Sequence, residues 1–129
     1  MTPSIDEAER LLRLARRDFQ AFAILGSHPE APLASVCFHA QQCAEKALKA
    51  VLTARQVYFR YTHDLEELTN LLTSAGITPP FTAGELIRLT PSAVELSYDE
   101  GIPLLTREEA GAIATRTLAW AEALVTIVQ

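Results

Sequence analysis

The stretch FHAQQCAEKALKAVL, residues 38–52, decides the fold of this chain. It is rich in Ala, Leu, Gln and Lys, which favour helix, and it contains neither Gly nor Pro. On a helix its polar side chains recur at intervals of three, four and seven, so that a polar strip lies beside an apolar one. The polar positions are Gln41, Gln42, Glu45, Lys46 and Lys49. The pattern predicts a helix over residues 33–54.

The chain on both sides of this segment has the same helical periodicity. Apolar residues recur at three- and four-residue spacing over residues 4–25, 63–75 and 107–128. A further helix is predicted over residues 83–97, kinked or divided at Pro91. Residues 55–62, RQVYFRYT, offer no polar face and are predicted to form an extended connection. The expected N-terminal caps are Ser4 with Glu7, Thr62, and Thr106 with Glu109.

No segment alternates in the manner of a β-strand, and the chain has 129 residues. We therefore expect a single all-α domain over residues 1–129, an antiparallel up-and-down bundle of four to five helices. No apolar run approaches the roughly 18 residues that a membrane span needs, so no membrane association is expected. The acidic N-terminus argues against a signal peptide, and the two cysteines, Cys37 and Cys43, are too few for a disulfide framework. These features predict a cytoplasmic protein.

The net charge of −5 is unevenly distributed. Residues 1–60 hold 8 Lys and Arg against 6 Asp and Glu, whereas residues 61–129 hold 3 against 10. Phosphate backbones are bound by clustered cations, so an acidic chain is a poor general coat for nucleic acid. A local basic site in the first half is still compatible with this balance.

Two stretches contain candidate binding chemistry. Glu45 and Lys49 are spaced as an exposed ion pair, whereas Lys46 has no such partner along the helix and is the better candidate for contacting an anion. His63 is predicted in the first turn of a helix, where free backbone N–H groups favour an anion. The alternative for His63 is a structural role, in which it hydrogen-bonds a backbone carbonyl and caps a turn.

Other kinds of site find little support. His39 and Cys43 have a spacing that two zinc ligands could use, but no second pair follows, and we expect no metal site and no cofactor. No glycine-rich phosphate loop follows a strand, and no Ser or Cys lies in a strained elbow.

The chain resembles the HEPN domain, a small helical domain found beside nucleotidyltransferases in prokaryotes. Three motifs carry the resemblance in the same order and separation. They are Ala8, Leu12, Ala15, Asp18 and Ala21 in the first helix, the run Gln42, Glu45, Lys46, Ala47, Leu48, Lys49 and Ala50, and Thr62-His63-Asp64-Leu65. The resemblance implies a helical bundle, a homodimer, and a nucleotidyltransferase partner in a toxin–antitoxin-type pair.

Many HEPN proteins are metal-independent RNases in which four to six residues lie between an Arg and a His. Here an Arg at that distance from His63 would stand at position 56, 57 or 58, which are Gln, Val and Tyr. The family's late Arg-Tyr pair is also changed, because Ser97 precedes Tyr98. We therefore expect a non-catalytic module that binds a nucleotide or a nucleotidyltransferase, rather than an enzyme.

The residues expected to bind the nucleotide phosphate are Gln42, Lys46, Lys49, Arg60 and His63. The double change Lys46→Ala and Lys49→Ala is expected to abolish binding and to leave the melting temperature nearly intact. The alternative is an RNase toxin that cleaves RNA with Arg60 and His63 in an unusual spacing. A third hypothesis is a structural helical protein without a ligand. Homodimerisation is expected because Tyr58, Phe59 and Trp120 would leave apolar surface uncovered.

Overall fold

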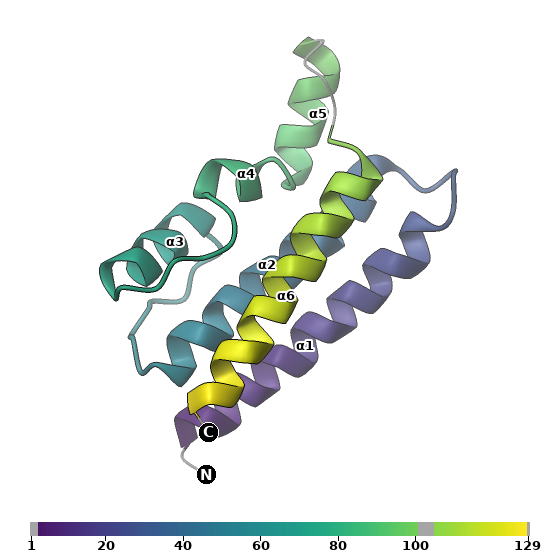
Figure 1. Ribbon diagram of the computed structural model, residues 1–129. Coiled ribbons are helices and arrows are strands. Elements are labelled where there is room, and N and C mark those ends of the chain that lie inside the picture. The colour runs from purple at the N-terminus through teal and green to yellow at the C-terminus, as the bar shows by residue number, and fades with distance from the viewer. Residues whose placement is uncertain (1–2, 101–104, 129) are drawn as a thin grey trace.

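The computed structural model describes the backbone of residues 3–100 and 105–128, with side chains over residues 4–95 and 105–127. Six helices account for most of it (Figure 1). They are α1 (Pro3–Gly26), α2 (Leu33–Ala54), α3 (Leu65–Ser74), α4 (Ala83–Ile87), α5 (Pro91–Glu100) and α6 (Arg107–Val128). No strand occurs within the described ranges, and the all-α fold class is confirmed. In the part of the chain that is described, none of the helices is both long and apolar enough to cross a membrane.

The centre of the fold is α2, which packs against α1 and α6 along its length and against the three short helices on its other side. Small residues allow this close approach, because Cys37, Ala40, Cys43, Ala44 and Ala47 are all fully buried. Large apolar side chains from the other helices fill the space around them. Among these are Leu12, Leu68, Leu72, Leu86 and Val125.

The three long helices α1, α2 and α6 lie side by side (Figure 1). The short loop after α1 makes α2 antiparallel to it. Helices α3, α4 and α5 then return the chain to the end of the bundle where α2 began, so α6 runs in the same direction as α2. The start of α1 and the end of α6 consequently lie at one end of the molecule (Figure 1).

Most helix boundaries agree with the sequence, and the differences have local causes. Thr106 and Glu109 form the predicted capping box, with reciprocal hydrogen bonds of 3.0 and 3.1 Å. The predicted cap at Thr62 is wrong, because Asp64 caps α3 and accepts hydrogen bonds from two backbone N–H groups. The first helix already begins at Pro3, which places Ser4 inside its first turn.

Pro91 divides the predicted helix over residues 83–97, as expected. The segment before it is α4, which is closed at its start by a capping box of Thr82 and Glu85. Pro91 itself is the first residue of α5, a position where its missing N–H is not needed.

Candidate functional site

A stripe of polar side chains runs along the face of α2 that lies against the segment before α3. Its members, Gln41, Glu45 and Lys49, are spaced by four residues and are all buried. Glu45 is only 1% exposed and Lys49 only 8%. The predicted exposed ion pair is therefore a buried one, with Lys49 Nζ 3.1 Å from Glu45 Oε2.

The connection between α2 and α3 covers this stripe. After α2 ends, Gln56 adopts a positive φ of 58° and the Val57 N–H returns to the Leu52 carbonyl, which turns the chain back along α2. The connection forms neither helix nor strand: residues 55–56 are a turn, and residues 57–64 are irregular. Its last residues are held by Thr62, whose buried hydroxyl accepts a hydrogen bond from the Asp64 N–H. This arrangement places His63 against Glu45.

His63 is anchored on one side and open on the other. Its Nδ1 lies 2.9 Å from Glu45 Oε2, and its side chain is otherwise largely exposed. Its Nε2 lies 3.3 Å from the hydroxyl oxygen of Tyr61. The two rings meet edge to face with centroids 5.3 Å apart, and Lys49 Nζ lies 5.7 Å from the centre of the Tyr61 ring. Tyr61 is 85% exposed, so its ring is available for stacking.

Lys46 lies in a second polar cluster, on the side of α2 that faces α1. Its ammonium forms an ion pair with Asp18 of α1, whose other carboxylate oxygen lies 3.5 Å from His39 Nδ1. The expectation that Lys46 is unpaired is therefore wrong, because a residue of another helix supplies the partner. Spacing along one helix cannot reveal such a contact.

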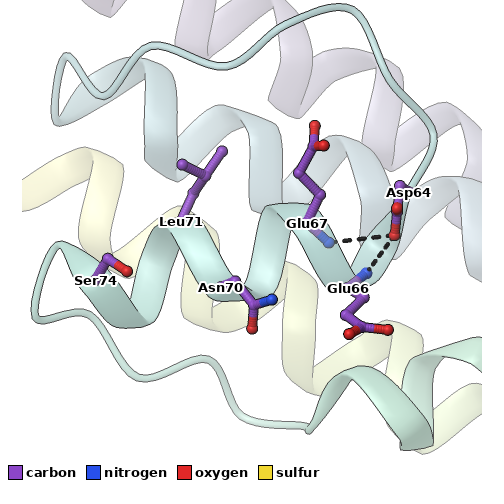
Figure 2. A pocket seen from close by; sticks show the side chains of 6 residues that line it. All are labelled: Asp64, Glu66, Glu67, Asn70, Leu71 and Ser74. Carbon is purple, nitrogen blue, oxygen red and sulfur yellow. Dashed lines mark hydrogen bonds between the residues drawn. The ribbon is translucent and has the colours of Figure 1, made fainter.

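Arg60 pairs with Glu67 of α3 and not with a member of the cluster around His63. Its Nε lies 2.9 and 3.0 Å from the two carboxylate oxygens of Glu67, which keep the pKa of the guanidinium above its usual value. Glu67 is part of an acidic hollow on α3 (Figure 2). The residues that line it are Asp64, Glu66, Glu67, Asn70, Leu71 and Ser74. An arginine held at this acidic surface is poorly placed to meet a phosphate beside His63.

Gln42 is connected to the site only indirectly, because its Nε2 donates to Gln41 Oε1 over 3.1 Å. The structure thus separates the five predicted phosphate ligands. Lys49 and His63 share Glu45, Gln42 is one step removed, and Lys46 and Arg60 have partners elsewhere. The Ser97–Tyr98 pair lies outside the described side chains.

The sequence reasoning missed two components of the site. The sequence predicts Glu45 as one half of an exposed pair, whereas in the structure it is the acceptor on which Lys49 and His63 converge. The sequence places Tyr61 only in an apolar connection. The signal that could have identified Glu45 is the series Gln41, Glu45 and Lys49 within a helix otherwise rich in alanine. If such a stripe is buried, its polar groups need hydrogen-bond partners from other elements.

The cysteines and histidines form no metal site in the described part of the chain, where no group of three or more potential ligands occurs. Cys37 and Cys43 are both buried free thiols. Burial raises the pKa of Cys43 to about 12, with the nearby Asp18 carboxylate adding to the effect.

Comparison with known proteins identifies a family for this chain. The family model described as HEPN domain matches residues 8–129. No curated protein and no solved structure matches the chain.

Proposed function

Because the chain belongs to the HEPN domain family, we propose that it is a nucleotide-binding module whose ligand lies against His63, Tyr61 and Lys49. The proposal is supported chiefly by one observation. An exposed imidazole is anchored on a buried carboxylate and stands beside an exposed aromatic ring. A nucleotide can be bound by a polar side chain that is held in a fixed position together with an adjacent aromatic ring on which the base stacks.

The proposed ligand set is narrower than the one expected from the sequence. Lys49 and His63 are retained, and Tyr61 is added as the surface on which the base stacks. Gln42 supports the site through Gln41. Lys46 and Arg60 are left out, because they pair with Asp18 and Glu67, which do not belong to the cluster of His63, Glu45 and Lys49.

The double change of Lys46 and Lys49 to Ala is not a clean test of this proposal. Both ammonium groups neutralise buried or half-buried carboxylates, so their removal is expected to lower the melting temperature as well. Substitutions at the exposed side chains separate binding from stability better.

The test is a titration of the full chain with adenosine monophosphate, followed by calorimetry. We expect Tyr61→Ala to weaken binding by about tenfold, since stacking on one aromatic ring contributes roughly 1–3 kcal/mol. His63→Ala should weaken it by a similar factor. Tyr58→Ala is the matched control, because Tyr58 lies in the same connection and is 84% exposed. Equal binding by the Tyr61 and Tyr58 variants would contradict the proposed site.

The family also supports a proposal about partners. We propose that the protein forms a homodimer and acts with a nucleotidyltransferase as a toxin–antitoxin-type pair. Of the three residues expected to mark the dimer surface, Tyr58 is exposed, whereas Phe59 and Trp120 are partly buried against the core. Light scattering should give about twice the 14.2 kDa of one chain.

A nucleotidyltransferase encoded beside the gene should co-purify with the protein and relieve any toxicity.

A second candidate function is RNA cleavage, favoured by the contact between His63 and Glu45. A carboxylate that holds the Nδ1 side of an imidazole leaves Nε2 free to act as a general base. In this alternative, Arg60 would have to leave Glu67 to reach the phosphate. An RNA-cleavage assay with His63→Ala as the control distinguishes the two functions.

A further inference from the structure

We propose that Glu45 is a positioning residue that fixes the tautomer of His63, with hydrogen on Nδ1 and an unprotonated Nε2 facing the ligand. This inference rests on the proposed function and specifies its chemistry: the ligand atom at His63 belongs to a hydrogen-bond donor such as a hydroxyl. A phosphate oxygen, which can only accept, would then be bound elsewhere in the site.

The direction of each hydrogen bond around Glu45 follows from its partners. Lys49 Nζ can only donate, and it lies 3.1 Å from Oε2. The amide of Gln41 donates to Oε1 over 3.2 Å, and its own oxygen is occupied by the amide of Gln42. Both carboxylate oxygens are therefore acceptors. His63 Nδ1, at 2.9 Å from Oε2, must be a donor as well.

A neutral imidazole has hydrogen on one nitrogen only. With hydrogen on Nδ1, the Nε2 of His63 is an acceptor, and the Tyr61 hydroxyl donates to it. Their separation of 3.3 Å is longer than the roughly 2.7–3.0 Å of a strong hydrogen bond from a hydroxyl. Tyr61 is also largely exposed. A ligand hydroxyl can therefore replace the tyrosine hydroxyl with little loss.

The groups that surround His63 are consistent with this assignment. From α2 it meets Glu45, whose charge is balanced by Lys49. From the connection it meets Tyr61. The next residue, Asp64, uses its Oδ1 as the cap of α3, where it accepts from the N–H groups of Glu66 and Glu67.

The molecule contains an internal control on the opposite side of α2. His39 Nδ1 faces Asp18 Oδ1 at 3.5 Å, and Asp18 is paired with Lys46 just as Glu45 is paired with Lys49. The remaining histidine, His28, is exposed in the loop after α1. It provides a reference for a ring that has no carboxylate partner among the described side chains.

The test is a long-range proton–nitrogen correlation spectrum of the ¹⁵N-labelled full chain without ligand, at a mildly alkaline pH well above the pKa of roughly 6.5 of a free imidazole. The spectrum distinguishes a protonated from an unprotonated ring nitrogen, and His63→Ala identifies the His63 signals. We expect His63 to show a protonated Nδ1 and an unprotonated Nε2. Glu45→Gln should abolish this single tautomer and give a mixture like that of His28, whereas Asp18→Asn should leave His63 unchanged.

A protonated Nε2 in the unaltered protein would overturn the proposal, and so would an unchanged His63 spectrum in Glu45→Gln. If Glu45→Gln does not fold, the spectra of the unaltered protein and of Tyr61→Phe still test the proposal. Removing the exposed Tyr61 hydroxyl should leave hydrogen on Nδ1 of His63. A change of tautomer in this variant would show that Tyr61, and not Glu45, fixes the tautomer. Because no ligand is present, failure here is distinct from failure of nucleotide binding.

Discussion

The Nδ1 atom of His63 lies 2.9 Å from the Oε2 atom of Glu45, which joins a largely exposed ring to a carboxylate that is almost completely buried. The same carboxylate pairs with Lys49, so three ionisable side chains, two from α2 and one from the connection before α3, form one cluster. The charges of Glu45 and Lys49 cancel, which makes burial of the pair tolerable. The cluster therefore connects the stability of the bundle with the candidate site.

The pair of Glu45 and Lys49 is expected to show strong coupling in a double-mutant cycle. Lys49→Met should lower the free energy of unfolding by about 3 kcal/mol, because it leaves a buried carboxylate without its cation. Glu45→Gln combined with Lys49→Met should cost clearly less than the sum of the single changes. Urea unfolding measures all three variants. Arg60→Ala, which breaks an exposed pair, serves as the control and should change stability little. Additive effects of the two buried changes would show that they do not interact.

Asp64 rather than Thr62 is expected to control the start of α3. Asp64→Ala should destabilise the protein by about 1 kcal/mol, since two backbone N–H groups lose their acceptor. Asp64→Asn retains a side-chain oxygen that can cap the helix, and it should recover most of this loss. Thermal unfolding compares the two variants, and an equal effect of Ala and Asn would contradict the assignment of the cap.

Arg107 is expected to hold the loop between α1 and α2 to the start of α6. Its guanidinium donates to the carbonyl of Ala31 over 2.6 Å and to that of Gly26 over 3.3 Å. Arg107→Ala should cost about 2 kcal/mol, because hydrogen bonds from a charged donor are lost and carbonyls at the end of α1 lose their partner. Arg107→Lys should be intermediate, since one ammonium cannot reach both carbonyls as a planar fork does. Hydrogen exchange in residues 26–32 should rise in the Ala variant. Unchanged exchange would exclude this role.

Cys43 is expected to make stability fall at alkaline pH. Burial raises the pKa of its thiol from 9.0 to about 12 in the folded chain. The unfolded chain therefore loses this proton first, and stability is lost progressively as the pH rises from about 9 toward 12. Cys43→Ala should have a shallower slope of unfolding free energy against pH in this window. The native thiol should also resist alkylation near neutral pH and react after denaturation. Rapid alkylation of the folded protein would contradict the burial of Cys43.

The purified protein is expected not to cleave cellular RNA above background. Arg60 is held by Glu67 at an acidic surface, so no arginine accompanies His63 at the candidate site in the described part of the chain. Without an arginine to stabilise the developing charge on the phosphate, a general base supplies only part of the rate enhancement. Incubation with total RNA and a chelator tests this expectation. Metal-independent cleavage that disappears in His63→Ala would make RNase activity the leading function.

The amino-acid sequence by itself determined the helices, because helix formation depends on neighbours within about one turn. The apolar periodicity, the break at Pro91 and the capping box of Thr106 and Glu109 are all such local signals, and each is found in the structure. The family was also accessible from sequence, since its motifs lie within single helices or at their starts. Thr62 was mistaken for the cap because Thr62 and Asp64 are both suitable cap residues, and only the path of the connection decides between them.

The tertiary structure alone decided which polar side chains meet. Glu45 and His63 are 18 positions apart, and Asp18 and Lys46 are 28 apart, so no helical spacing relates the members of either pair. Glu45 appeared exposed in sequence because a helix pattern does not show which neighbour will cover its polar strip. In the structure the strip is buried, and two residues of the connection, His63 and Tyr61, contact Glu45 and Lys49. A buried charge needs a partner from an element that packs against it. Helix α1 supplies Asp18 to Lys46 on one side of α2, and the segment before α3 supplies His63 to Glu45 on the other.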